Sequence, residues 1–262
     1  MNRKALITGA SSGIGKALAA EFAKRGFGLL LTARDTNRLE TLADELEDRF
    51  GIDAETFTAD LSTSDDVEKL VRWAGEYDVD VLVNNAGFAV KGDFADTDIS
   101  DEFTMLDVQL SAMLRLTKHA VAAMKQRNKG TILNVASVYS FSPVPQQAVY
   151  AACKSFIYSF SSSLKAELRS TGVTVSVLAP GITRTEFRTR AGIADKNNAG
   201  MSAEAVALIA VERALKGDLL IVPGLQNKLF VFLSRHLPIS LSIRLIEFIN
   251  ARRGLKTTAD RS

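Results

Sequence analysis

Short runs of Val, Ile and Leu alternate along the chain with longer segments whose apolar residues recur every three or four positions. This alternation constrains the fold more than any other feature. The short runs suit buried strands, and the longer segments have the period of amphipathic helices. Strands separated by helices form a parallel sheet with helices on both faces. We therefore expect a doubly wound α/β fold with seven parallel strands, at 4–8, 28–33, 54–59, 79–84, 130–136, 173–179 and 219–222.

The 262 residues contain no internal repeat and no Pro/Gly-rich linker. We expect one domain over residues 1–224 and a basic, apolar helical extension over 225–262. The extension carries seven basic and two acidic residues, a charge of +5, so the total of +2 leaves −3 for the rest. This balance does not favour nucleic acid as a partner.

Two further classes of feature are missing from the sequence. With one cysteine, Cys153, and two distant histidines, we expect neither a disulfide nor a metal site. No run has the pattern of a signal peptide or the length of a membrane span, so we expect a cytoplasmic protein.

A glycine-rich turn follows the first predicted strand and opens a helix expected over 14–25. Its residues include Gly9, Ser11, Ser12, Gly13, Ile14 and Gly15. Glycines there let the backbone approach a pyrophosphate, and the helix N-terminus supplies N–H groups. This is the pattern of a Rossmann-type dinucleotide site, although a plain strand-to-helix turn also uses glycine.

Tyr150 and Lys154 lie four residues apart and therefore on one helix face. Lys154 is the only charged residue between Gly130 and Leu164, and an ammonium is costly to bury without a partner. We expect it to lower the pKa of Tyr150 from about 10, as a general acid/base requires. Ser137 ends the fifth strand, at the edge where ligands bind. The competing interpretation is a surface pair without chemistry.

In order and spacing, these motifs resemble those of the short-chain dehydrogenases/reductases. The glycine turn matches the family's T-G-x-x-x-G-x-G, and further motifs match along residues 3–223. The matching residues are Asp60, Leu61, Asn84, Ala86, Gly87, Ser137, Tyr150, Lys154, Pro180, Gly181, Ile182 and Thr185.

The resemblance implies an NAD(P)-dependent oxidoreductase that transfers a hydride between the cofactor and a carbonyl or alcohol. Ser137 and Tyr150 would hold the substrate oxygen, Tyr150 would transfer the proton, and Lys154 would also hold the nicotinamide ribose. Asp60 would contact the adenine, and Pro180 and Gly181 would border the nicotinamide. The resemblance also implies a homo-oligomer, a dimer or tetramer, with helices at 101–127 and 149–170 as candidate interfaces.

The second predicted strand ends near Ala33, so Arg34 follows its tip, although Asp35 lies where a carboxylate for the ribose is usual. A guanidinium at Arg34, with Arg38 one turn on, suits the 2′-phosphate of NADP. Family members that prefer NADP commonly carry a basic residue at the Arg34 position, whereas their other basic position is Ser12 here. We expect NADP(H) in preference to NAD(H); otherwise both arginines lie on a solvated helix face.

The sequence departs from the family at Gln109, where many members have an asparagine that helps to hold a water in a proton relay. Glutamine adds a methylene, and a displacement of about 1 Å at a catalytic group can cost roughly a hundredfold in rate. Gln109 therefore either serves the relay or only packs against a neighbour. We interpret Cys153, which has no nearby histidine, as a packing residue.

The residues expected around the reacting centre are mostly apolar, which favours an apolar carbonyl compound or its alcohol. They are Phe88, Val90, Tyr139, Phe141, Val144, Pro145, Gln147 and Phe187. The alternative is that several of them pack on the core. A polar, irregular segment over 183–200 is long enough to form a loop over the site.

From Ile239 to Ile249, the polar residues Ser240, Arg244 and Glu247 occupy one narrow helix stripe, and the rest is apolar. Such a helix must be covered by the body of the protein, a second subunit or a membrane surface. We favour packing on the body or over the substrate mouth. Two functions compete with catalysis: a dinucleotide-sensing regulatory protein with little turnover, and a peripheral membrane protein.

Overall fold

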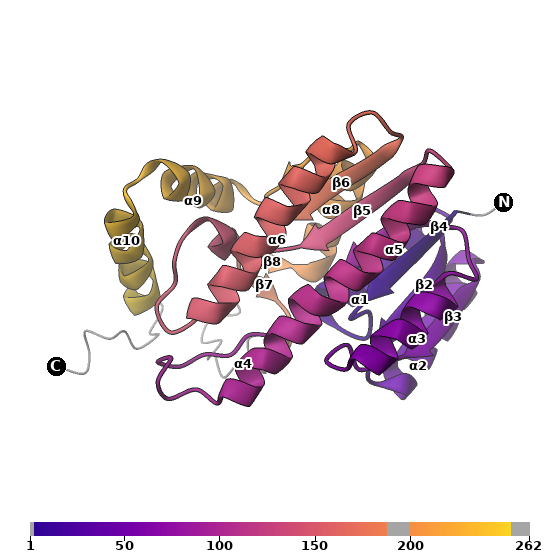
Figure 1. Cartoon of the computed structure of the whole chain (residues 1–262), viewed down its shortest axis with the longest axis horizontal. Coiled ribbons are helices and arrows are strands. Elements are labelled where there is room, and N and C mark those ends of the chain that lie inside the picture. The colour runs from indigo at the N-terminus through magenta and orange to yellow at the C-terminus, as the bar shows by residue number, and fades with distance from the viewer. Residues whose placement is uncertain (1–2, 188–199, 253–262) are drawn as a thin grey trace.

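The computed structural model describes residues 3–187 and 200–252 (Figure 1). Its centre is a seven-stranded parallel sheet in the order β3-β2-β1-β4-β5-β6-β9. The strands are β1 (Lys4–Thr8), β2 (Gly28–Ala33), β3 (Ala54–Thr58), β4 (Val79–Asn84), β5 (Gly130–Val135), β6 (Val173–Leu178) and β9 (Leu220–Ile221). Each lies within one residue of the predicted ends, and the Rossmann-type doubly wound fold is confirmed.

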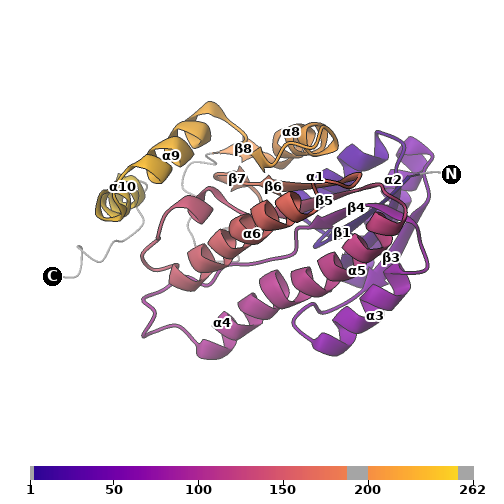
Figure 2. The same ribbon diagram turned by 45° about the horizontal axis from the view of Figure 1, so that its top comes forward.

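Helices cover both faces of the sheet (Figure 2). One layer contains α1 (Gly13–Ala23), α2 (Thr36–Phe50) and α8 (Ala203–Leu215). The other contains α3 (Ser64–Ala74), α5 (Ala112–Gln126) and α6 (Ala148–Glu167). Leu29, Leu30 and Leu31 of β2 are fully buried, and they divide between the two hydrophobic clusters on either side of the sheet. This two-sided burial explains why β2 is a nearly continuous apolar run.

The first helix begins one residue earlier and ends two residues earlier than predicted. Ser12 is extended, with φ −159°, so α1 begins at Gly13. At the other end the chain turns at Gly26, whose φ is +73°, a left-handed conformation that ends a helix readily.

The order of the strands reverses between β1 and β4, which are neighbours at the centre of the sheet. In open α/β sheets, ligands bind at the carboxyl ends of the strands beside such a switch point. Three short elements stand at or near that edge: α4 (Ile99–Leu106), the π-helical turn η1 (Asp107–Ser111) that joins α4 to α5, and the 3₁₀ turn η2 (Val138–Phe141).

The segment predicted as a loop over 183–200 begins in a small second sheet. In it β7 (Thr183–Arg184) pairs in parallel with β8 (Met201–Ser202). Two-residue strands show no alternation of apolar and polar residues, so the pattern could not predict them. Residues 188–199 of the expected loop lie outside the described residues.

The C-terminal extension forms two helices, α9 (Leu225–His236) and α10 (Ile239–Arg252), at the end of the molecule far from β3 (Figure 1). Ile246 of α10 is buried against Val144 and Ala151, in a cluster that Tyr139 and Phe230 border. The prediction that this extension packs on the body is therefore confirmed for its described part. Within the described residues, no helix has both the length and the hydropathy needed to cross a membrane.

Candidate active site

The turn between β1 and α1 adopts a conformation that glycine tolerates best. Gly9 and Gly13 have φ of +65° and +56°, and a Cβ on Gly9 would lie 2.9 Å from Cα of Ala86. Ser11, Ser12 and Ile14 are half-buried. Ser12 caps α1 without a side-chain hydrogen bond, and no acidic residue stands in the first helical turn. The predicted anion site at this helix N-terminus therefore keeps its N–H groups and its positive end.

The segment after β4 is tied to this turn by hydrogen bonds. The Thr8 hydroxyl accepts from the backbone N–H of Asn85 at 2.9 Å and of Ala86 at 3.0 Å. The Asn85 amide also donates to the Thr8 carbonyl at 2.9 Å. Neither Thr8 nor Asn85 was among the predicted site residues, although both stand inside the matched motifs.

Asn84 has a structural position inside the sheet. Its amide donates to Thr117 Oγ1 at 3.0 Å and to Asn134 Oδ1 at 2.8 Å. The Asn134 amide in turn donates a hydrogen bond to Ser161 Oγ at 2.8 Å. These buried contacts fix β4 against β5 and the helices behind them, because a buried amide must keep its partners. The following Gly87 lies against the Gln109 side chain.

Arg34 and Asp60 follow the carboxyl ends of the adjacent strands β2 and β3. Backbone and hydroxyl hydrogen bonds from Ser62 lower the pKa of the Asp60 carboxyl, and the Arg34 charge adds to this. Leu61 is buried. Arg38 meets two carboxylates: its Nε lies 3.4 Å from Asp35 Oδ2, and its Nη1 lies 3.3 Å from Glu186 Oε2. Glu186 was not among the predicted site residues.

Ser137, Tyr150 and Lys154 come together beyond the end of β5, and each is less than 9% exposed. Ser137 follows the strand in an extended conformation, while Tyr150 and Lys154 lie one turn apart on α6. Lys154 Nζ is 5.5 Å from the centre of the Tyr150 ring and donates to the Val135 carbonyl at 3.0 Å. The predicted trio is thus a spatial cluster rather than an exposed surface pair.

The prediction that Lys154 lowers the pKa of Tyr150 is wrong. Burial raises the pKa of Tyr150 well above its usual range, and the hydrogen bond with Ser137 opposes this only in part. Burial likewise lowers the pKa of Lys154, to about 8. Loss of hydration is the largest cause of both pKa shifts, and it favours the neutral forms of Tyr150 and Lys154. Burial also raises the pKa of Cys153, consistent with a packing thiol.

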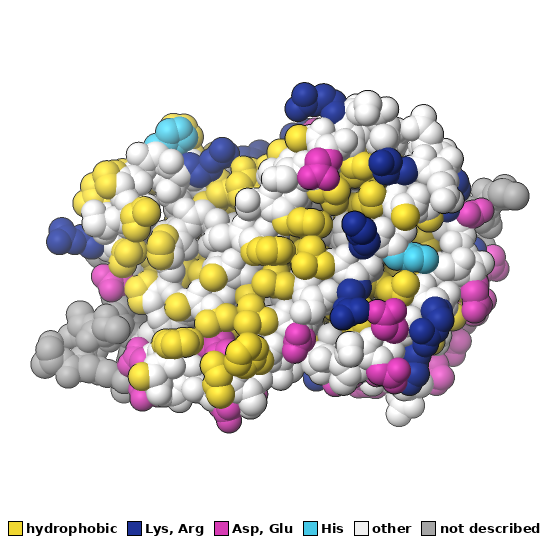
Figure 3. All heavy atoms as spheres, in the orientation of Figure 1, with side chains coloured by type: hydrophobic (Ala, Val, Ile, Leu, Met, Phe, Trp, Pro, Cys, Tyr) yellow, Lys and Arg dark blue, Asp and Glu magenta, His cyan; other side chains and the backbone are white. Residues whose placement is uncertain are grey.

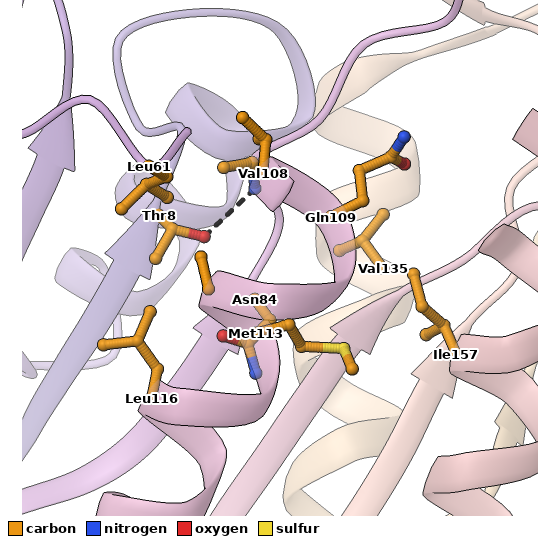
Figure 4. A pocket seen from close by; sticks show the side chains of 11 residues that line it. Thr8, Leu61, Asn84, Val108, Gln109, Met113, Leu116, Val135 and Ile157 are labelled. Carbon is orange, nitrogen blue, oxygen red and sulfur yellow. Dashed lines mark hydrogen bonds between the residues drawn. The ribbon is translucent and has the colours of Figure 1, made fainter. Parts of the chain in front are cut away.

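Gln109 lies in the π-helical turn η1 and is 2% exposed. Its Nε2 donates to the Phe88 carbonyl at 3.0 Å, whereas its Oε1 has no partner among the described residues. Thr8, Asn84 and Gln109 border a small cavity, and the Gln109 amide points away from the other two (Figure 4). Single π-turns inside helices are frequent at functional sites.

The predicted substrate residues divide into two groups. Phe88, Val90, Tyr139 and Phe187 gather around Tyr150, with the Phe187 ring 6.1 Å from the Tyr150 ring. Val144 instead packs on α10, and Gln147 is buried at the start of α6. Phe141 is not part of the cluster around Tyr150, and its ring packs on Tyr158 at 4.8 Å.

The segment after β6 connects the site with the C-terminal helices. Pro180 accepts a hydrogen bond from the Val138 backbone at 3.1 Å, and Thr185 lies against Gly13. A Cβ on Gly181 would collide with the Asn227 side chain of α9. Asn227 was not predicted as a site residue, because no local motif marks it.

The residues present fit a dinucleotide cofactor. The glycine turn approaches Ala86 so closely that a Cβ would fill the space, and the helix N-terminus above it carries no competing carboxylate. Two arginines flank the far end of the same edge. Among the described residues, no group of three or more His, Cys, Asp or Glu could hold a metal ion.

A parallel sheet of this order, with a glycine-rich turn at its switch point, defines a Rossmann-type dinucleotide-binding protein. A family model described as "short chain dehydrogenase" matches residues 3–195, and the chain belongs to this family of NAD(P)-dependent oxidoreductases that act on carbonyl and alcohol groups.

Two curated relatives are similar over about two thirds of the chain. Nodulation protein G of Rhizobium sp. (strain N33) is 41% identical over 68% of this chain and 72% of its own length. Sulfoacetaldehyde reductase of Chromohalobacter salexigens is 40% identical over 69% of this chain and 72% of its own.

Two solved structures match nearly the whole chain. A short-chain dehydrogenase from Sphingobium yanoikuyae in complex with NADPH has a TM-score of 0.82 and 32% identity, covering 97% of this chain and 94% of that one. The bulky-bulky ketone specific alcohol dehydrogenase of Comamonas testosteroni has a TM-score of 0.77 and 29% identity, covering 97% and 93%.

Proposed function

We propose that this protein interconverts a carbonyl and an alcohol on an apolar small molecule with NADP(H), and that Tyr150 is the general acid/base. The observation that carries the proposal is the buried cluster of Ser137, Tyr150 and Lys154 beside the dinucleotide groove. In carbonyl reduction the protonated Tyr150 phenol would donate to the substrate oxygen, and in alcohol oxidation it would take the proton back.

Each residue of the cluster has a separate task. The hydroxyls of Ser137 and Tyr150 hold the substrate oxygen, and Tyr150 gives it a proton as the carbonyl is reduced. Lys154, fixed by the Val135 carbonyl, would hold the ribose hydroxyls and support the charge left on Tyr150. The bound nicotinamide supplies the hydride. Gln109 stays a candidate member of the proton relay through its unpartnered Oε1.

The cofactor would lie along the carboxyl edge of the sheet. Gly9, Gly13 and the N-terminus of α1 would hold the pyrophosphate, and Arg34 and Arg38 would bind a 2′-phosphate. Asp60 and Leu61 would border the adenine. Asn84, Ala86, Gly87, Pro180, Gly181, Ile182 and Thr185 would border the nicotinamide half. The similarity to a structure that holds NADPH supports this choice of cofactor.

An apolar substrate is favoured by the side chains around Tyr150. Phe88, Val90, Tyr139 and Phe187 present rings and methyl groups, and α9 and α10 add Phe230 and Ile246 behind Tyr139. The similar ketone-specific enzyme supports a bulky carbonyl substrate.

The proposal is tested with a panel of aliphatic, aromatic and cyclic ketones and aldehydes, followed by the oxidation of NADPH and NADH at 340 nm. We expect turnover of apolar carbonyl compounds with NADPH at a higher kcat/KM than with NADH. Tight NADPH binding without turnover of any member of a broad panel would instead support a dinucleotide-sensing protein.

Copies of the chain would associate through α4, α5 and α6. Hydrophobic side chains gather over these helices (Figure 3), and Phe103, Leu114 and Phe156 are exposed there. Exposed apolar patches of this kind commonly mark subunit interfaces. We propose that this face makes the homo-oligomer.

A second surface favours contact with an anionic membrane, as a separate proposal. The outer side of α9 exposes Leu225, Leu229 and Phe232, beside the exposed Lys228 and Arg235. We expect the protein to float with vesicles that contain anionic lipid and not with neutral ones. Phe232→Glu should abolish flotation, whereas Phe103→Glu, at an equally exposed phenylalanine of α4, should preserve it. Equal flotation of both variants would remove the membrane proposal.

A further inference from the structure

The segment Thr183–Phe187 contacts three parts of the proposed cofactor and substrate site. Near its middle, Thr185 packs on Gly13 of the glycine turn, such that a Cβ there would lie 3.3 Å from Thr185 Cβ. At the next residue, Glu186 Oε2 lies 3.3 Å from Arg38 Nη1 on α2. The last residue, Phe187, packs against Tyr150. One short segment therefore touches the adenosine end, the pyrophosphate turn and the catalytic tyrosine.

The contact between Glu186 and Arg38 joins residues 148 positions apart in the chain. It occupies one of the two arginines that suit a 2′-phosphate. Arg38 also faces Asp35, whose carboxylate accepts the Arg38 backbone N–H at 3.1 Å and caps α2. Asp35 therefore has a structural task, whereas Glu186 approaches the guanidinium from a different part of the fold.

A phosphate group that binds Arg38 competes with the Glu186 carboxylate, which is also negatively charged. The guanidinium has a limited number of N–H donors, and a bidentate contact with phosphate needs two of them. The phosphate must displace Glu186 from Nη1 or share the guanidinium with it. A dinucleotide whose ribose carries only a hydroxyl group has no such competition.

We propose that Glu186 is an internal competitor for Arg38, so that it weakens the binding of a dinucleotide that carries a 2′-phosphate and leaves the binding of one without it unchanged. The inference rests on the proposed function, because it takes the groove as the cofactor site. It makes Glu186 a specificity-determining residue that moderates the preference given by Arg34 and Arg38. Displacement of Glu186 also removes one contact of the segment Thr183–Phe187, whose last residue packs against Tyr150.

The expected size of the effect follows from exposure. The side chains of Arg38 and Glu186 are 50% and 56% exposed. Exposed ion pairs contribute little, so replacing Glu186 should change affinity by about two- to fivefold. The effect should also shrink at high salt, where exposed charges are screened.

The test is the dissociation constants of NADPH and NADH, measured by isothermal titration calorimetry on the full chain. Glu186→Gln should tighten NADPH about two- to fivefold and leave NADH within about 1.5-fold. Glu45→Gln is the matched control. It removes one exposed carboxylate from α2, where Glu45 pairs with Lys16 at 3.0 Å, and should change neither constant.

A double-mutant cycle tests whether the effect of Glu186 on NADPH affinity depends on Arg38. In an Arg38→Ala background, Glu186→Gln should no longer alter NADPH affinity, because the guanidinium for which the two groups compete is gone. An unchanged or weaker NADPH affinity in Glu186→Gln would overturn the inference, as would equal tightening of NADPH and NADH. The proposed cofactor function would survive either result. Failure of the wild-type protein to bind any dinucleotide would overturn both.

Discussion

Tyr150→Phe is expected to reduce kcat for carbonyl reduction by about a thousandfold, within the range typical for loss of a general acid. The substitution removes only the hydroxyl that hydrogen-bonds Ser137 and would deliver the proton. The ring remains, so its packing with Phe187 and the fold are preserved. NADPH affinity should stay within about twofold, and calorimetric binding measured beside steady-state rates separates the two effects.

The matched control is Tyr158→Phe, on the same helix. Tyr158 packs on Phe141 at 4.8 Å, in a contact that does not include Ser137 or Lys154. We expect its kcat to stay near that of the wild type. Retention of most activity by Tyr150→Phe, with the cofactor still bound, would remove Tyr150 from the role of proton donor.

Arg34→Ala is expected to weaken NADPH binding by about ten- to a hundredfold and to leave NADH almost unchanged. A hydrogen bond to a charged group contributes about 1.5 to 3 kcal/mol, and Arg34 stands exposed at the tip of β2 with its charge reaching Asp60. The measurement is the ratio of the two dissociation constants and of the two kcat/KM values.

Arg49→Ala controls for the loss of one positive charge at the opposite end of α2 from Arg34. Arg49 stands in the last turn of α2, with its guanidinium over the Phe50 ring, so it cannot reach a phosphate at the tip of β2. The Arg49→Ala variant should not alter the preference for NADPH over NADH. An Arg34→Ala variant that keeps the wild-type ratio would show that this guanidinium does not read the 2′-phosphate.

The five inner strands β1, β2, β4, β5 and β6 could be predicted because their two-sided burial selects apolar residues continuously, whereas the edge strand β3 is only partly buried. The pairing of Tyr150 with Lys154 followed from the spacing of helix positions, which is a local property. That Ser137 joins them followed from the resemblance to the short-chain dehydrogenases/reductases.

Contacts between distant parts of the chain could not be predicted. Neither the approach of Glu186 to Arg38 nor that of Asn227 to Gly181 leaves a periodic mark in the sequence. Phe141 packs on Tyr158 and not in the cluster around Tyr150, because position near a motif does not determine where a ring points. The pKa of Tyr150 was predicted in the wrong direction because spacing indicates which charges are close, whereas the loss of water around a group depends on the whole fold.

The wall behind Tyr139 is built by residues that follow the family's shared region. The family model ends at residue 195, whereas Phe230 and Ile246 come from α9 and α10. Two relatives can therefore have the same cofactor groove and the same proton donor and still accept different molecules. Substrate assignments transferred through the common region would overlook this difference. Exchange of the last forty or so residues between relatives offers a direct way to redesign selectivity without disturbing the chemistry.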